Sequence, residues 1–284
     1  MAARFWVGGT GTWDASDTTH WASSSGGAGG QSVPGTSDTV TLDGSSGGGT
    51  VTVNTNVAVQ SITCGAFTGT LDFSANNNNV TLTASSAFSG TGTGTRTINL
   101  GNGTWILSAT AGAGASITPW NMGTTTNLTF NANSSTISVT GSSAGTVNFT
   151  GGGLTYATVA FSAQAGARIA MTGANTFGTL TIAGGPTYTT LASDLTIGTF
   201  NLNGSSSGQI GLISAAGGAR TVAITTLSAS WTSFREMAFS GSGLNATNSF
   251  DLGTNSGFTI TPPSTGGGTT PQQFSMVGTL TLIS

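Results

Sequence analysis

Only 5% of the 284 residues are Asp, Glu, Lys or Arg, whereas about a quarter are charged in an ordinary globular protein. The chain has no Lys, and its Arg residues are scattered without forming a basic stripe, so we expect no nucleic-acid partner. A disordered chain is also excluded, because such chains are usually charged and poor in the Val, Ile, Thr and Phe that are plentiful here.

Residues 1–36 differ from the rest because they hold three Trp in a Gly-rich stretch. Large aromatic side chains need burial, and the open end of a stack of strands would expose unpaired backbone. We therefore predict that Trp6, Trp13 and Trp21 lie in an N-terminal cap or attachment segment. The first residues lack a basic region followed by an apolar run, so we expect no signal peptide. No apolar stretch approaches membrane-spanning length, so we expect no membrane partner.

After residue 36 the dominant pattern is alternation of apolar residues with Thr, Ser or Asn, which is typical of β-strands. Gly, Asn and Ser separate the alternating segments, as turns require. No segment of helical length shows a 3.6-residue period. We therefore predict strands in 38–43, 50–54, 69–73, 80–83, 95–100, 127–130, 136–139, 146–149, 179–182 and 199–202.

Similar blocks recur at intervals of about 20 residues, which is typical of repeat architectures. They start at Thr104, Asn127, Thr146, Arg168, Thr179 and Thr199. The shorter interval from 168 to 179 indicates two successive strands of one turn. This rhythm favours an all-β fold, a right-handed parallel β-helix or solenoid, with 37–262 as its body. A β-sandwich or jelly roll also has many short strands with frequent turns and stays the alternative.

The C-terminal segment, residues 263–284, follows Pro262 and contains Gly266–Gly268. It returns to an alternating apolar run from Met276 to Ile283. Such a segment usually docks as a strand, within its own chain or on a neighbouring subunit. We therefore predict a linker and a docking strand that includes Leu280 and Leu282.

Candidate chemistry is sparse. Glycoside cleavage needs two carboxylates across a cleft, and the candidates are Asp14 with Asp17, Asp38 with Asp43, Asp72, Asp194, Asp251 and Glu236. Their positions beside strands and in Gly- or Thr-rich segments favour turn formation instead, and Glu236 is expected to pair with Arg235. His20 and Cys64 are the only His and Cys, so we expect no zinc site, a His20 ring packed against Trp and a buried Cys64 thiol. We expect no catalytic residue, no metal and no cofactor.

A distinctive pattern opens the chain: 4–14 (RFWVGGTGTWD), Trp21, Gly26–Gly30, Val33–Pro34 and Ser37–Leu42. This pattern resembles the start of virion proteins of tailed bacteriophages. Its residues cover roughly the first fifth of the chain and are also similar to units in the β-helical passenger regions of bacterial autotransporter adhesins. The expected lack of a signal peptide favours the phage family, and in both families the pattern is structural.

With the lack of charge, this resemblance implies a non-enzymatic structural protein on the exterior of a bacteriophage particle. It implies a capsid decoration protein, a head fibre or a tail appendage, made in the host cytoplasm and released by lysis. Its expected partners are other virion proteins and further copies of itself, as in a trimer. Two alternatives stay open. One is a tail spike that binds or cleaves host polysaccharide, with a host-surface glycan as partner and Trp105, Trp120 and Trp231 as candidates for sugar stacking. The other is an adhesin or ice-binding solenoid with one flat face of aligned Thr.

Overall fold

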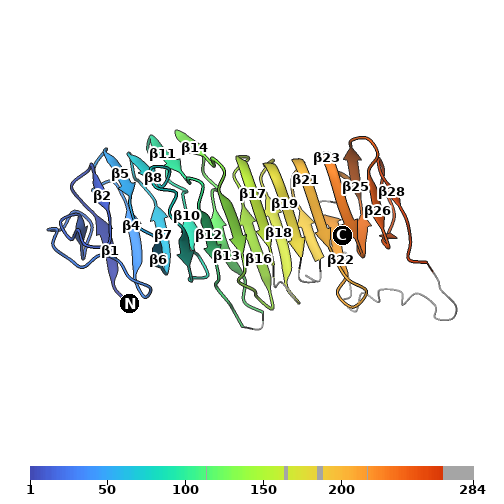
Figure 1. Ribbon diagram of the computed structural model, residues 1–284, viewed down its shortest axis with the longest axis horizontal. Coiled ribbons are helices and arrows are strands. Elements are labelled where there is room, and N and C mark those ends of the chain that lie inside the picture. Colours follow the sequence, from blue (N-terminus) through green and yellow to red (C-terminus); the bar gives the residue numbers. More distant parts are fainter. Residues whose placement is uncertain (113, 163–165, 184–187, 216, 265–284) are drawn as a thin grey trace.

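The computed structural model describes residues 1–112, 114–162, 166–183, 188–215 and 217–264. Figure 1 shows these residues as one elongated stack of strands, with the first strands at one end and the last at the other. Among them every regular element is a β-strand and none is a helix.

The strands form three sheets, here called A, B and C. Sheet A consists of β1 (Ala3–Trp6), β3 (Trp21–Ala22), β4 (Thr39–Leu42), β7 (Ser61–Cys64), β10 (Phe88–Ser89), β13 (Ile117–Asn121), β16 (Thr146–Thr150), β18 (Arg168–Thr172), β20 (Tyr188–Leu191), β22 (Ile210–Ser214), β24 (Thr232–Arg235) and β27 (Phe250–Asp251). Sheet B consists of β2 (Gly11–Trp13), β5 (Thr50–Val53), β8 (Thr70–Asp72), β11 (Arg96–Asn99) and β14 (Leu128–Asn131). Sheet C consists of β6 (Val57–Val59), β9 (Val80–Leu82), β12 (Thr104–Leu107), β15 (Thr136–Val139), β17 (Thr155–Phe161), β19 (Thr176–Ala183), β21 (Leu195–Asn203), β23 (Arg220–Ser230), β25 (Met237–Ser240), β26 (Asn245–Thr247) and β28 (Thr259–Ile260).

Within the described chain, every strand pairing is parallel except that of β1 with β3. From β4 to β15 the chain passes from sheet A to sheet B and sheet C and then back to the next strand of sheet A, and from β16 to β24 it alternates between sheets A and C. We call each return to sheet A a coil. This arrangement is consistent with the predicted β-solenoid. It does not fit the β-sandwich alternative, whose sheets are antiparallel.

Alternation explains why these segments are strands. In β4, β5 and β15 buried residues alternate with half-buried ones, so each strand gives one face to the interior. All ten segments predicted as strands from the alternation are confirmed. Because neighbouring coils are in register, the inward residues form continuous rows, for example Val80, Trp105, Ile137, Val159, Leu180 and Phe200.

The strands of the predicted cap are continuous with those of the predicted body. β1 and β2 belong to sheets A and B, where they pair with β4 and β5 of the predicted body. The boundary at residue 36 therefore lies within a continuous pair of sheets, and the predicted division of the chain into 1–36, 37–262 and 263–284 stays a prediction.

The coil length differs from the predicted rhythm in the first half of the chain. Thr104 pairs with Thr136, a separation of 32 residues that also separates the bonded Asn99 and Asn131. The predicted intervals from Thr104 to Asn127 and on to Thr146 are wrong as coil repeats, because these blocks lie in sheets C, B and A in turn. In the second half the spacing is confirmed, since Arg168 bonds Thr146 and Tyr188, 22 and 20 residues away.

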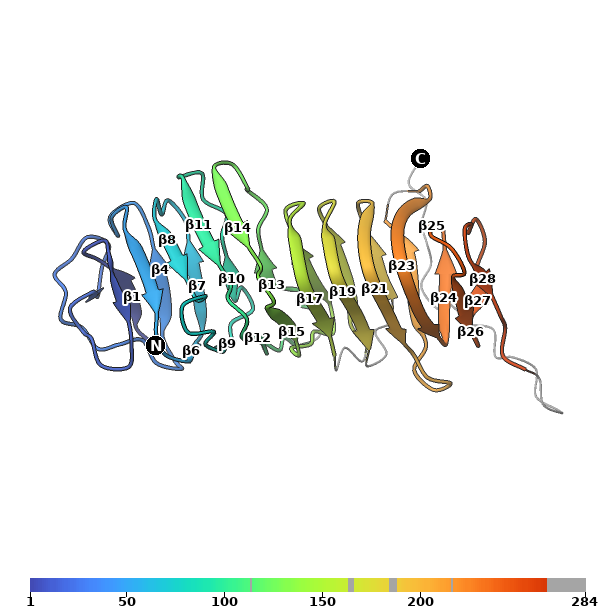
Figure 2. The same ribbon diagram turned by 45° about the horizontal axis from the view of Figure 1, so that its top comes forward.

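The coils become shorter because sheet B ends at β14. In β17, β19, β21 and β23 a single long strand runs where a sheet B strand and a sheet C strand ran before; after β23 two short strands, β25 and β26, pair with its two ends. Figure 2 shows β17, β19, β21 and β23 side by side as these long strands.

The buried guanidinium of Arg96 forms hydrogen bonds with the two segments that precede β11 and β14. Arg96 is only 2% exposed, and its guanidinium donates to the carbonyl oxygens of Gly90, Gly94, Thr124 and Thr126. These carbonyls belong to the segments that lead into β11 and β14, so one side chain ties two successive coils together. The sequence did not single out this role among the scattered Arg residues.

We predict that Arg96→Lys lowers the free energy of unfolding by about 1.5–3 kcal/mol, the value of one hydrogen bond to a charged group. A lysine ammonium cannot reproduce the planar fork that reaches four carbonyls. Chemical denaturation measures the change. The control is Arg4→Lys, at a half-buried side chain whose hydrogen bonds to Ser32 are exposed to solvent, where we expect a change within about 0.5 kcal/mol. Equal effects of the two substitutions would contradict the assignment.

Candidate functional site

The candidate catalytic carboxylates are engaged in holding turns. Asp14, Asp17, Asp43, Asp72 and Asp251 each accept a hydrogen bond from the backbone N–H two residues further on. This is the Asx-turn geometry that the sequence predicted for such positions.

The other acids also have local or structural partners. Asp38 accepts from the backbone N–H groups of Ala2 and Gly35, and Asp194 accepts from that of Thr221. Glu236 lies 4.0 Å from the Arg235 guanidinium, as predicted. Each acid therefore already has a backbone or ionic partner in the fold.

The three N-terminal Trp residues form one buried aromatic cluster. The ring centroids of Trp6 and Trp21 lie 5.1 Å apart, and those of Trp13 and Trp21 lie 5.0 Å apart, both in edge-to-face geometry. His20 stacks on Trp6 at 4.6 Å, as predicted, and its Nδ1 lies 2.8 Å from the Val7 carbonyl oxygen. All three indoles are at most 1% exposed.

The position of this cluster fits the cap prediction. Trp6 and Trp13 come from β1 and β2, and Trp21 comes from β3, the strand that runs antiparallel to β1 at the end of sheet A. An antiparallel strand laid over the first coil covers an edge that would otherwise be open. The cap role of Trp6, Trp13 and Trp21 stays a prediction. Leu280 and Leu282, the predicted docking residues, lie outside the described residues.

The remaining Trp residues offer little surface to a ligand. Trp105 and Trp120 are fully buried and pack edge to face at 5.9 Å. Trp120 also donates to the Tyr156 hydroxyl, which in turn donates to the Gly151 carbonyl. Of the three indoles considered for sugar stacking, only Trp231 is partly exposed.

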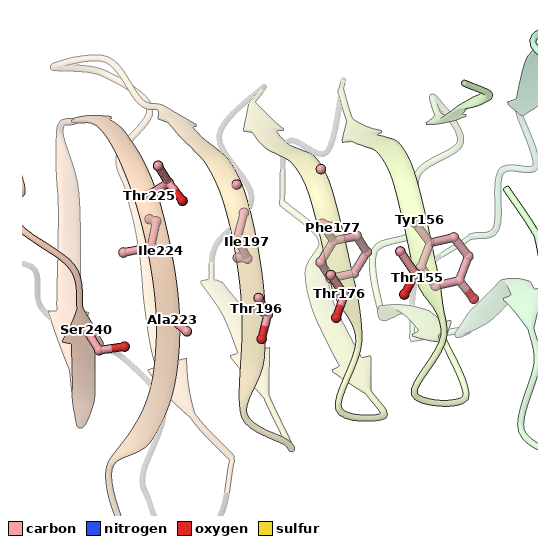
Figure 3. Close-up of a pocket in the computed structure, with 12 residues that line it drawn as sticks. Thr155, Tyr156, Thr176, Phe177, Thr196, Ile197, Ala223, Ile224, Thr225 and Ser240 are labelled. Carbon is pink, nitrogen blue, oxygen red and sulfur yellow. The ribbon is translucent and has the colours of Figure 1, made fainter. Parts of the chain in front are cut away.

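A groove crosses the long strands of the second half of the chain. We call it the threonine trough; it has a volume of about 510 Å³. Its lining residues are Thr155, Tyr156, Thr176, Phe177, Gly178, Thr196, Ile197, Gly198, Ala223, Ile224, Thr225 and Ser240. Figure 3 shows the hydroxyl-bearing side chains of Thr155, Thr176 and Thr196 on successive strands.

The trough follows a shared irregularity in these strands. Register pairs join Thr176 to Thr196 and Phe177 to Ile197, skip one position, and resume at Thr179 with Thr199. Gly178 and Gly198 occupy the skipped position. A Cβ on Gly198 would lie 2.6 Å from the Gly178 carbonyl oxygen, so glycine is needed where the coils approach closely.

Three of the threonine hydroxyls of the trough lie in one row. Thr155, Thr176 and Thr196 are register partners on β17, β19 and β21, and the row continues through Ala223 to Ser240. None of the lining residues is charged. Tyr156 is buried against Trp120, and burial is the main cause that raises its pKa. The sequence analysis missed this site, although the repeated TYAT, TFGT and TIGT at 155–158, 176–179 and 196–199 would have indicated it.

A second row of Thr bears on the ice-binding alternative. Six outward Thr in sheet C are in register: Thr104, Thr136, Thr158, Thr179, Thr199 and Thr226. The neighbouring outward row is mixed: Ile106, Ser138, Ala160, Thr181, Asn201 and Ser228. The aligned Thr surface is therefore one residue wide over most of sheet C, and two rows wide only on β17, β19 and β21, where Thr155, Thr176 and Thr196 form the other row.

The described part of the chain offers neither a metal site nor a reactive thiol. Nowhere in it do three or more His, Cys, Asp or Glu side chains gather as a metal site would need. Cys64 is buried, and burial raises the pKa of its thiol to about 12. Nor do the described residues include a helix long and apolar enough to span a membrane. Comparisons with protein-family models, curated proteins and solved structures find no match.

We predict that Trp21→Ala destabilises the N-terminal end by about 3–5 kcal/mol, the usual cost of removing a buried Trp side chain. Hydrogen exchange followed by mass spectrometry should then show faster exchange in β4 and β7 and no change in β21 and β23. Trp231→Ala, at a partly exposed indole, is the control and should leave β4 and β7 unchanged. Uniform acceleration along the whole chain would contradict a local capping role.

A pH dependence is predicted at Asp38. The hydrogen bond from the Gly35 N–H is the main cause that lowers the pKa of Asp38 in the folded chain. Its stabilising contribution is therefore present above the ordinary Asp pKa and is lost as the pH falls through the lowered folded value. We expect Asp38→Asn to lower Tm at pH 7 and the difference from wild type to shrink between about pH 4 and pH 2. A constant difference in Tm across this range would contradict the assignment.

Proposed function

We propose that this chain is a structural, non-enzymatic protein on the exterior of a tailed bacteriophage particle: a capsid decoration protein, a head fibre or a tail appendage. The observation that carries the proposal is the stack of parallel, in-register coils with an almost uncharged outer surface. Such a stack provides a stiff shape, and its polar groups are largely used in turns and in contacts between coils.

The contacts between coils support this proposal. Asn131 donates to the Asn99 side chain, and Asn99 donates to Asp72, so one ladder of polar side chains crosses three coils of sheet B. Asn56, Asn79 and Asn102 accept from backbone N–H groups of the following coil. Side chains that stabilise the stack in this way are suited to a durable exterior protein.

The proposal includes the handedness of the solenoid and its assembly. We infer a right-handed parallel β-helix, because crossovers between parallel strands of one sheet are right-handed in about 98% of cases. The chain would assemble as a homo-oligomer such as a trimer and contact other virion proteins. It would be made in the host cytoplasm and released with the particles by lysis.

A second candidate function is a tail spike that recognises host polysaccharide. The threonine trough is the observation that favours it, because it is a groove lined by hydroxyls on the outside of the stack. Binding is favoured over cleavage, since no carboxylate is among the lining residues and glycoside hydrolysis needs two.

The test is the location of the chain in purified particles. We expect mass spectrometry to find it in particles banded on a density gradient, at many copies relative to the portal or tail-tip proteins. Antibodies raised against the purified chain should label the outside of intact particles in electron micrographs. Recovery of the chain only in the soluble lysate, with unlabelled particles, would refute the proposal.

A further inference from the structure

We propose that the threonine trough binds a single chain of neutral polysaccharide, laid across the strands and along the long axis of the stack. This inference goes beyond the particle assignment and does not rest on it. It rests on three properties of the trough: its hydroxyl row, its direction and its lack of charge.

The hydroxyl row has a spacing suited to a linear polymer. Thr155, Thr176 and Thr196 are direct register partners, so their hydroxyls repeat at the strand separation of about 4.8 Å. This repeat is close to the rise of one sugar unit in an extended β-1,4-linked glycan. Successive sugars would therefore meet equivalent hydroxyls on successive coils.

The trough has most room at its centre. Gly178 and Gly198 lack side chains at the skipped positions of β19 and β21, so the floor is low between the rows of Thr176 with Thr196 and Thr179 with Thr199. On the flanking strands β17 and β23 the skipped positions carry the side chains of Ala157 and Thr225. Each threonine hydroxyl both donates and accepts, which matches sugar hydroxyls that do the same. Ser240 extends the polar row beyond Ala223.

Other polymers fit less well. A peptide added as a strand needs a free backbone edge, but β19 and β21 each have hydrogen-bonded strands on both sides. A nucleic acid needs cationic side chains, and the lining has none.

In this proposal the trough binds the polysaccharide without cleaving its glycosidic bonds. Its one phenol, Tyr156, donates to the Gly151 carbonyl and accepts from the Trp120 indole, so its hydroxyl has no free role toward a sugar. The bound glycan should therefore be recovered intact.

The experiment is affinity electrophoresis of the purified chain in native gels that contain a soluble neutral polymer. Hydroxyethylcellulose and galactomannan, which have β-1,4-linked backbones, are the probes; α-1,6-linked dextran is the neutral comparison and alginate the charged one. We expect retardation by at least one of the two probes and less by dextran and alginate, with no shortening of the polymer on size-exclusion chromatography. Absence of retardation by both probes would overturn the proposal, as would stronger retardation by dextran or alginate, or shortening of the polymer.

Two matched double variants locate the binding. Thr176→Val with Thr196→Val removes two trough hydroxyls while keeping β-branched side chains that favour strands. Thr70→Val with Thr97→Val makes the same change at register partners of sheet B, away from the trough. We expect the apparent Kd for the retarding polymer to rise at least tenfold in the trough variant and to stay within twofold in the sheet B variant. Equal affinities of the two variants would overturn the assignment to the trough.

Discussion

The structure depends on one constraint: each coil buries its apolar residues only by stacking in register on its neighbours. In-register stacking places equivalent residues about 4.8 Å apart on successive strands. Like charges in such positions would repel, whereas Thr, Ser and Asn donate and accept between coils. The charges that are present have neutral neighbours, as Asp72 has in Thr52 and Asn99, and Arg168 in Thr146 and Tyr188. The scarcity of charge is thus a consequence of the stack rather than a direct signature of a ligand.

The Trp cluster, the buried Arg96 and the threonine trough lie where the regular repeat of the coils changes. At the N-terminal end β3 pairs antiparallel with β1 at the edge of sheet A, and the three Trp rings pack together. In the long coils, the Arg96 guanidinium satisfies carbonyls that leave the regular ladder. Beyond β14, where one long strand replaces two, the skipped register position forms the floor of the threonine trough. A groove on the outer surface therefore follows from the same change in coil length.

The sequence predicts the local part of this structure well. Alternation identifies strands such as 136–139 because one face of each is buried, and Asp14 or Asp43 beside such segments indicates turns. The sequence does not show which of the three sheets each strand joins. The blocks that start at Thr104, Asn127 and Thr146 are similar in sequence but lie in three different sheets. They are successive strands around the stack, not equivalent strands of successive coils. Arg96 and the trough depend on which segments become neighbours across coils, which composition and alternation do not specify.

The central claim is that the coils stack in one continuous register, and a distance between spin labels tests it most directly. Thr104 and Thr226 are the ends of the row of six aligned Thr in sheet C, and both are accessible for labelling after conversion to Cys in a Cys64→Ala background. Five strand separations predict a distance of about 24 Å by pulsed electron paramagnetic resonance. A narrow distribution near this value supports the stack. A distance well outside that range, or a broad distribution without a maximum there, would contradict it.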